Sequence, residues 1–391
     1  MNVTVAIDSF KGSLTSLEAG RAAKAGILRA MPDARVAVRP LADGGEGTAS
    51  ALTAGMGGEW VAARVTGPLG QPVTAGYGIV RESKTAILEM SSAAGITLVP
   101  AEKRNPLKTT TYGVGELIRL AVEQGCRRFL VGIGGSATND GGLGMLEALG
   151  FGMLGADGKP VAPFGIGLRD LSAISLENVM PELAECEFRI ACDVTNPLCG
   201  PDGCSAVFGP QKGADETIVR EMDGWLADYA AIAAKVSGHA TPDTPGAGAA
   251  GGLGFAFLAF FRARLESGVG LVLRETRLED SIRGADYVVT GEGRLDAQTV
   301  MGKAPEGVAR AAKKYGKPVI AFAGSAAADA VKCNEHGIDA YFPVLRRPCT
   351  LEEAMKPENA AANLSDTAEQ VFRLIAADQT RYQEKKDEHF E

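Results

Sequence analysis

Short apolar runs rich in β-branched residues alternate along the chain with alanine-rich amphipathic stretches, and polar glycine loops follow the apolar runs. The first run, Val3 to Ile7, leads into the loop of residues 8–13, and a helix is expected over 17–31. A second strand is expected over 35–40, ending at the loop of residues 43–48. Strand, loop, helix and strand in this order predict a parallel βαβ unit, because parallel strands need a crossover connection.

The same pattern returns twice further along the chain. The expected elements are helices over 113–124, 143–149 and 305–315, strands over 128–133, 188–192, 287–289, 318–322 and 340–344, and a strand meander over 61–80. We therefore expect an α/β fold, with a Rossmann-like or flavodoxin-like parallel sheet domain and a second, inserted α/β domain. Residues 1–60 and 280–391 are assigned to the first domain and about 61–279 to the second, with 106–150 left open between them.

Composition narrows the class of protein. The chain has 391 residues, 46% hydrophobic and 23% charged, which is typical of a folded protein large enough for two domains. The formal net charge of −8, with only 6% aromatic residues, disfavours nucleic acid as a partner. Small molecules are the expected partners, and the chain is expected to be a monomer or homodimer.

The cysteines and the apolar segments indicate the cellular compartment in which the protein is expected. Seven cysteines without regular pairing distances indicate reduced thiols, and the N-terminus lacks the basic and apolar regions of a signal peptide. Residues 244–261 carry no charge, but the segment is short and rich in glycine and alanine, which disfavours a membrane span. We expect a cytoplasmic protein that does not enter the membrane.

The loop after the strand at 128–133 is the strongest candidate for a phosphate site. In parallel sheets ligands bind outside the carboxyl ends of the strands, where glycines and successive N–H groups favour an anion. This loop offers such donors and hydroxyl groups directly before a helix, and the nucleotide-binding candidates are Gly134, Gly135, Ser136, Ala137, Thr138 and Asn139. Asn139 and Asp140 add oxygens that suit a metal. The alternative is a tightly packed crossover turn.

Other strand ends also carry charged side chains. Asp43 and Glu46 suit magnesium, which needs only one or two carboxylates, although the same spacing is also a helix-capping pattern. Lys11 could neutralise a phosphate or carboxylate, or be an ordinary surface lysine. Asp193 is a candidate general base after its strand. The cysteines at 192, 199 and 204 lack the spacing of a zinc site.

The loop at 290–296 has the densest charge. Arg294 could clamp a carboxylate with two hydrogen bonds, and Glu292 or Asp296 could hold a metal or accept a proton. A salt-bridged surface loop is the alternative reading of the same residues.

Several familiar signatures are absent from the sequence. There is no Walker A loop and no protein-kinase signature set, and the Gly-x-Gly-x-x-Gly at 246–251 does not follow a strand. The three histidines lie outside the polar glycine loops, so a histidine-based mechanism is disfavoured. From the residues alone, a kinase for a small hydroxy acid, a nucleotide-dependent oxidoreductase and a non-catalytic anion sensor remain distinct alternatives.

Taken together, the motifs resemble those of the bacterial type I glycerate kinase family. The matching segments are DSFKGSL (8–14), LADGGEGT (41–48), GIGGSATNDGGLGML (132–146), ACDVTNPLCGPDG (191–203), FGPQKGA (208–214), GAGAAGGLG (246–254), TGEGRLDAQT (290–299) and GKAPEGVA (302–309). Cys204 is a mild departure, where a smaller residue is expected. The resemblance implies an active site in a cleft between two domains, ATP and Mg²⁺ as co-substrates, and D-glycerate as the acceptor. It favours 2-phosphoglycerate as the product, in glyoxylate, glycolate or sugar-acid metabolism.

A mechanism consistent with both the residue patterns and the family resemblance gives each candidate residue a role. Lys11 and the glycine loop hold the phosphates, and Mg²⁺ lies near Asp43, Glu46 or Asp296. Asp193 accepts the hydroxyl proton, so Asp193, Lys11 and Arg294 form the catalytic set. The substrate-binding set is Asp8, Ser9, Glu292 and Arg294.

Overall fold

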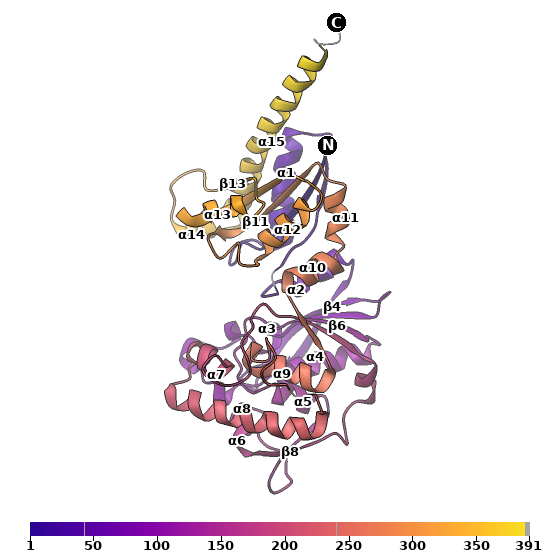
Figure 1. The fold of residues 1–391 in the computed structure, drawn as a ribbon, viewed down its shortest axis with the longest axis vertical. Helices are drawn as coiled ribbons and strands as arrows, with labels where there is room; N and C mark the ends of the chain where they lie inside the picture. Colours follow the sequence, from indigo (N-terminus) through magenta and orange to yellow (C-terminus); the bar gives the residue numbers. More distant parts are fainter. Residues whose placement is uncertain (43, 240, 388–391) are drawn as a thin grey trace. The chain divides into compact units, whose positions relative to one another are not determined.

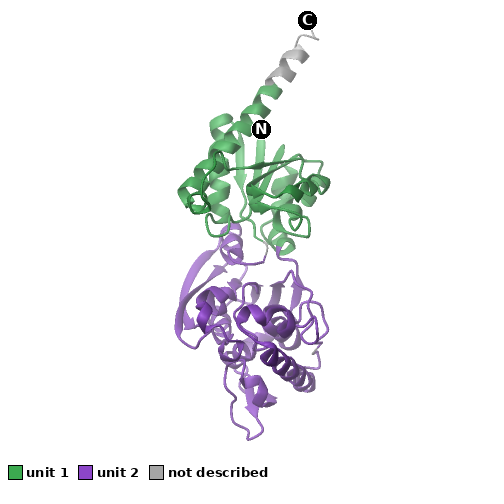
Figure 2. Cartoon of the chain, turned by 90° about the vertical axis from the view of Figure 1, so that its left-hand side faces the viewer, with its two compact units in different colours: residues 1–43, 269–391 green, residues 44–268 purple. Residues whose placement is uncertain are grey.

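The structure, a computed structural model, describes residues 1–42, 44–239 and 241–387, with side chains as far as residue 379. The chain forms two compact units: unit 1 contains residues 1–43 and 269–391, and unit 2 contains residues 44–268 (Figure 2). From the sequence we expected the chain to pass from one domain to the other near residues 60 and 280. The segment 106–150, which the sequence left open, is part of unit 2. Unit 2 is thus inserted into the discontinuous unit 1, and the observed boundaries differ from the expected ones by 11 to 17 residues.

Unit 1 is built on a five-stranded, fully parallel sheet (Figure 1). The strands are β1 (Asn2–Ile7), β2 (Arg35–Val38), β11 (Tyr287–Leu295), β12 (Val319–Ala326) and β13 (Ala340–Pro343). Their spatial order is β13-β12-β11-β1-β2. Counted along this unit the order is 2-1-3-4-5, which is the flavodoxin-like arrangement. The predicted fold class is therefore confirmed for this unit.

Strand β11 is longer than the sequence indicated. We expected a strand over 287–289 followed by a loop, but pairing with β12 continues as far as Leu295 opposite Ala326. The charged residues Glu292 and Arg294 therefore lie on a strand rather than in a loop. Because side chains alternate across a strand, these two residues face the same side of the sheet.

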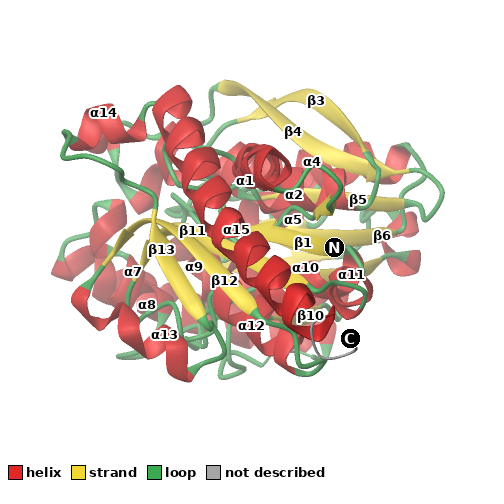
Figure 3. Ribbon diagram, turned by 90° about the horizontal axis from the view of Figure 1, so that it is seen from above, coloured by secondary structure: helices red, strands yellow, loops and turns green. Residues whose placement is uncertain are grey.

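Helices α1 (Ser16–Ala30) and α15 (Pro357–Asp387) lie side by side in unit 1 (Figure 3). The α1 helix begins at Thr15, whose hydroxyl accepts the N–H of Glu18 while the Glu18 carboxylate accepts the N–H of Thr15. Arg29 donates to Asp366 of α15 at 2.8 Å. Packing is close because Gly26 faces the main chain of α15. Further α-helices of this unit are α10 (Gly268–Glu275), which begins at the last residue of unit 2, α11 (Leu278–Arg283), α12 (Ala304–Lys313), α13 (Lys332–Glu335) and α14 (Leu351–Met355).

Unit 2 contains a six-stranded mixed sheet in the order β10-β9-β6-β5-β4-β3. Its strands are β3 (Glu59–Thr66), β4 (Pro72–Val80), β5 (Thr85–Glu89), β6 (Arg128–Gly132), β9 (Glu187–Ala191) and β10 (Arg264–Glu266). The strands β5, β6, β9 and β10 run parallel, so their carboxyl ends meet at one edge. The antiparallel pair β3 and β4 matches the meander expected over 61–80.

Helices and a small hairpin complete unit 2. The helices are α2 (Thr48–Gly55), α3 (Ser91–Ala94), α4 (Tyr112–Glu123), α5 (Leu143–Ala148), α6 (Gly167–Asp170), α7 (Cys204–Phe208), α8 (Glu216–Ser237) and α9 (Ala249–Phe261), and the hairpin pairs β7 (Gly152–Gly155) with β8 (Leu171–Ser175). The uncharged segment at 244–261 contributes α9, whose residues are largely buried. Among the described residues, no helix is both long enough and apolar enough to cross a bilayer.

Substitution of Gly26 tests the packing of α1 on α15. A Cβ atom at Gly26 would lie 1.9 Å from the main-chain oxygen of Ser365. Gly26→Ala is therefore expected to lower the free energy of unfolding by on the order of 2 kcal/mol, measured by urea denaturation. The matched control is Gly224 in α8, which is exposed and has open space around it. Gly224→Ala should instead raise stability by about 0.5–1 kcal/mol. Equal effects at both sites would contradict the described packing.

Candidate functional site

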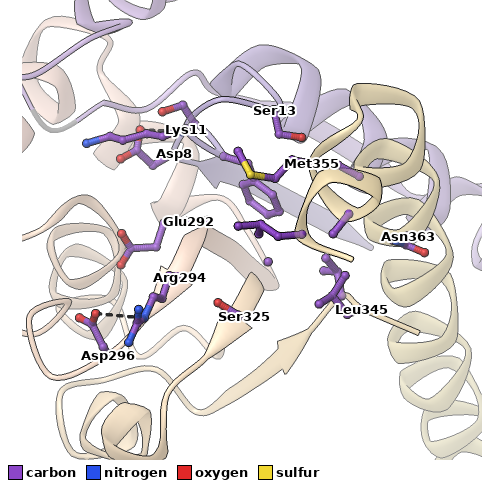
Figure 4. Close-up of a pocket in the computed structure, with 18 of the residues that line it drawn as sticks. Asp8, Lys11, Ser13, Glu292, Arg294, Asp296, Ser325, Leu345, Met355 and Asn363 are labelled. Atoms are coloured by element: carbon purple, nitrogen blue, oxygen red, sulfur yellow. Dashed lines mark hydrogen bonds and ion pairs between the residues drawn. The ribbon is translucent and has the colours of Figure 1, made fainter. Parts of the chain in front are cut away.

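A pocket of about 500 Å³ lies in unit 1 at the carboxyl ends of β1 and β11. These two strands are neighbours, but the chain leaves them toward opposite edges of the sheet, to β2 and to β12. Such a reversal of strand order opens a crevice, and ligands bind there in open α/β sheets. Six residues predicted from the sequence line this pocket: Asp8, Ser9, Lys11, Glu292, Arg294 and Asp296 (Figure 4).

The acidic residues of this pocket lie among cations. Lys303 Nζ is 3.9 Å from Glu292 Oε2 and also 3.9 Å from Asp296 Oδ1. Arg294 Nε lies 3.6 Å from Asp296 Oδ2, and most of the Arg294 side chain is exposed. Glu292 also accepts a hydrogen bond from the Thr299 hydroxyl at 2.7 Å. Both signs of charge are thus held at one edge of the sheet, with Arg294 open to an incoming anion.

Asp8 stands where β1 ends and is only 5% exposed. Its Oδ1 atom accepts the N–H of Ser9 at 2.7 Å, which fixes the carboxylate at the start of the loop. Gly293 of β11 lies beside this loop, since a Cβ there would approach Phe10 Cα to 3.5 Å. The first loop of the chain and the late strand β11 therefore form one continuous lining.

The carboxylates of this pocket suit a Mg²⁺ ion that is also bound by the phosphates of a ligand. Within the described ranges, no three His, Cys, Asp or Glu side chains are grouped so that they could hold a metal by themselves. Mg²⁺ usually takes one or two carboxylates and completes its shell with water and substrate phosphates. Glu292 and Asp296 lie equally close to the Lys303 ammonium, so this pair can share a cation. The residues therefore suit a metal that arrives with a phosphorylated ligand.

A second group of predicted residues lies at the parallel edge of the unit 2 sheet. Asp193 follows β9, and its Oδ1 atom accepts the N–H of Gly268 at 3.1 Å. A Cβ at Gly44 would lie 3.2 Å from Asp193 Oδ2, and one at Gly134 would lie 3.1 Å from Gly45 Cα. The loop that starts at Gly44 is therefore in contact with both neighbouring strand ends.

The predicted metal pair of the 43–48 loop can be placed only in part. Glu46 is exposed on unit 2, whereas Asp296 belongs to the pocket of unit 1. Asp43 lies outside the described residues. The assignment of Mg²⁺ to Asp43, Glu46 or Asp296 therefore stays a prediction.

The glycine loop after β6 differs from the open cradle that the sequence suggested. Ser136 is 9% exposed, Thr138 is fully buried, and Asn139 is 1% exposed. The N–H of Ala137 donates to the carbonyl of Ala94 at 2.9 Å and is therefore not free for a phosphate. Residues 136–139 form a packed turn in this structure, with their side chains buried in the unit, and their assignment to the nucleotide stays a prediction. Of the candidates in this loop, Gly134 and Gly135 are accessible to a ligand.

Asp140 is also a structural residue rather than half of an open metal pair. Its carboxylate is fully buried and accepts the N–H and the hydroxyl of Thr111, both at 2.8 Å. It also accepts the N–H groups of Gly142 and Gly144, at 3.2 and 3.3 Å. Burial raises the pKa of Asp140, and these hydrogen bonds oppose that rise. Asp140 thus fastens the glycine loop to the start of α4.

Lys212 is a buried cation that the sequence analysis missed. It is 2% exposed, and its ammonium donates to Ser136 Oγ at 2.9 Å and to the carbonyl of Thr138 at 2.6 Å. Burial lowers the pKa of Lys212 to about 8. Its signal in the sequence was the lysine in FGPQKGA, which followed no strand. Lys212 explains why the glycine loop is held in place from within the unit.

Glu89 is the second missed residue, at the end of β5. Its carboxylate accepts the N–H of Ala49 at 2.5 Å, and burial raises the pKa of this side chain. A half-buried carboxylate with a raised pKa at the carboxyl edge of a parallel sheet is a candidate for function, because acids with perturbed pKa values gather at functional sites. The signal was an acid that closes the buried strand Thr85–Glu89.

The buried ammonium of Lys212 predicts a pH dependence of stability. Its pKa is lowered in the folded protein, so between about pH 8 and 10.5 the unfolded chain binds more protons than the folded chain. The contribution of Lys212 to the free energy of unfolding therefore rises with pH in this window. Relative to Lys212→Met, the wild type should gain on the order of 2 kcal/mol between pH 7 and pH 9.5 in urea titrations. Parallel pH profiles of the two proteins would contradict a lowered pKa.

Comparison with known proteins gives a consistent result along almost the whole chain. The model of the Glycerate kinase family matches residues 3–376. A glycerate kinase of Haemophilus influenzae is 46% identical over 376 residues, which cover 96% of this chain and 99% of that protein. A glycerate 2-kinase of Escherichia coli K12 is 48% identical over 356 residues, covering 91% and 93%. A crystal structure assigned to a glycerate kinase 2 from Salmonella typhimurium LT2 superposes with a TM-score of 0.89 at 45% identity, over 97% of this chain and 99% of that one.

Proposed function

The chain belongs to the glycerate kinase family, and we propose that it transfers the terminal phosphoryl group of ATP to a hydroxyl group of D-glycerate. The observation that carries the proposal is near full-length identity of 46% and 48% to proteins named for this activity. The name of the Escherichia coli relative favours 2-phosphoglycerate as the product. A cytoplasmic location belongs to the same proposal, supported by seven cysteines that are all free thiols.

Charge in the unit 1 pocket supports the proposed reaction. Phosphoryl transfer depends mainly on positioning and on neutralising the charge of the phosphates. Lys11 and Lys303 are assigned to the phosphates, and the exposed guanidinium of Arg294 to the carboxylate of glycerate. Asp8 and Ser9 lie beside them and are assigned to the hydroxyl groups of the acceptor.

Magnesium is part of the proposal because of the donor set in the same pocket. Of the metal residues predicted from the sequence, Asp296 is assigned to Mg²⁺ in this pocket. Glu292 is added as a second candidate ligand, because both carboxylates face Lys303. When bound, Mg²⁺ would neutralise phosphate oxygens as they approach the acceptor. Lys303 then exchanges its carboxylate contacts for contacts with phosphate.

The carboxyl edge of unit 2 supplies the proposed proton acceptor. Asp193 keeps one carboxylate oxygen on the N–H of Gly268, and this contact orients the side chain. Gly134 and Gly135 remain candidates for contact with a phosphate through their main chain. We add Glu89 as a candidate that acts at the same edge.

An acceptor panel tests the proposed function directly. Purified protein with ATP and Mg²⁺ should consume ATP with D-glycerate and far more slowly with glycolate, lactate or tartronate. The phosphorus signal of 2-phosphoglycerate is split by one methine proton, whereas that of 3-phosphoglycerate is split by two methylene protons. Proton-coupled ³¹P spectra should therefore show a doublet. No ATP consumption with glycerate would refute the function, and a triplet would refute only the 2-position.

The role of Asp193 predicts a defect in turnover rather than in nucleotide binding. Asp193→Asn retains an oxygen for the N–H of Gly268 but cannot accept a proton. Turnover should fall by about a hundredfold or more, with the KM for ATP within about twofold of wild type. Asp157→Asn, at an exposed residue of unit 2, is the matched control and should leave turnover unchanged. Near-normal turnover of Asp193→Asn would exclude this residue as the base.

A further inference from the structure

The pocket of unit 1 has an apolar part that the proposed acceptor does not explain. Its apolar lining comes from the first loop and from the segment after β13: Phe10, Val344, Leu345, Leu351 and Met355. Leu345 is 44% exposed and Leu351 is 75% exposed, so apolar surface is left open to solvent inside a cavity. Glycerate is a three-carbon acid with two hydroxyl groups, and it gains little from such a wall. Exposed apolar surface in a pocket points to a ligand with an apolar face.

Two polar groups belong to the same part of the pocket. Asn363 projects from α15 on the same side as Leu345 and Met355, across from Glu292 and Arg294 (Figure 4). Within the part of the chain that the structure describes, the side-chain amide of Asn363 makes no hydrogen bond to the protein, and its main-chain carbonyl accepts the hydroxyl of Thr367.

Ser13 also lies on this side of the pocket (Figure 4). Its hydroxyl oxygen is buried and has no partner among the described residues. A buried hydroxyl without a partner is destabilising unless a ligand supplies the missing hydrogen bond. The buried Ser13 hydroxyl and the partly exposed Asn363 amide are polar groups in an apolar wall, and a flat ring with polar edges would complement both.

We propose that this apolar part binds the adenine base of ATP and that the Asn363 amide contacts the edge of the base. This inference rests on the proposed function, because it names the position of its phosphoryl donor. An amide both donates and accepts, and adenine presents a donor at N6 next to an acceptor at N7. Lys11 and Lys303 line the charged part of the same cavity, so a nucleotide can extend from the apolar wall to these cations. The cavity of about 500 Å³ is within the usual range for small-molecule sites.

Kinetics with ATP and ITP test the contact to the base. ITP carries an oxygen in place of the 6-amino group, so it cannot pair with an amide at both positions. Wild type should prefer ATP over ITP by about tenfold or more in kcat/KM. In Asn363→Leu the KM for ATP should rise about tenfold, the preference should fall to within about twofold, and the KM for glycerate should stay unchanged. Gln370→Leu, an exposed amide on the same helix outside the pocket, should behave as wild type.

A second variant keeps the test independent of the folding of Asn363→Leu. Leu351 is 75% exposed, so Leu351→Ala should fold normally, and it should raise the KM for ATP several-fold. Unchanged ATP kinetics in both variants, or a change confined to the KM for glycerate, would overturn the proposal. If wild type fails to phosphorylate glycerate, the proposed function fails instead. Calorimetric titration with ADP and IDP then tests the adenine site alone. Equal affinities of wild type for ADP and IDP would overturn the proposed adenine site. Tighter binding of ADP that is weakened by Asn363→Leu would support it.

Discussion

The site depends on one topological constraint, the reversal of strand order between β1 and β11. All strands of a parallel sheet end at the same edge, and the reversal leaves the ends of these two strands uncovered by a crossover. Residues from opposite ends of the sequence, Lys11 and Glu292 among them, therefore line one pocket. The inserted unit does not disturb this arrangement, because it enters the chain after β2 and leaves it before β11.

Unit 2 follows the same rule of strand ends but uses its polar residues differently. At its parallel edge, Lys212 and Asp140 are withdrawn from solvent and bind the main chain and hydroxyl groups of their own loops. Buried charges of this kind are tolerated only when hydrogen bonds compensate for lost hydration. They fix the shape of the glycine loop, while Asp193 and Gly135 remain exposed to a ligand. The residues that stabilise the loop are thus adjacent to the residues proposed for the chemistry.

Sequence patterns predicted the elements well, because apolar periodicity and glycine loops are local signals. They also selected six of the charged and polar residues that line the unit 1 pocket, since strand ends share an edge. The extension of β11 was missed because it depends on pairing with β12. The inward turn of residues 136–139 was missed because its partner, Lys212, lies more than 70 residues away in the sequence. Asn363 carried no signal, since a single amide on a helix is usually a surface residue.

The most direct test of this account is a crystal structure with Mg²⁺ and a non-hydrolysable ATP analogue. We predict density for the nucleotide in the unit 1 pocket, with the base between Leu351 and Met355 and the phosphates near Lys11 and Lys303. The metal should contact Glu292 or Asp296. A nucleotide bound instead on the glycine loop of unit 2, with the pocket at the β1 and β11 ends empty, would contradict the central claim.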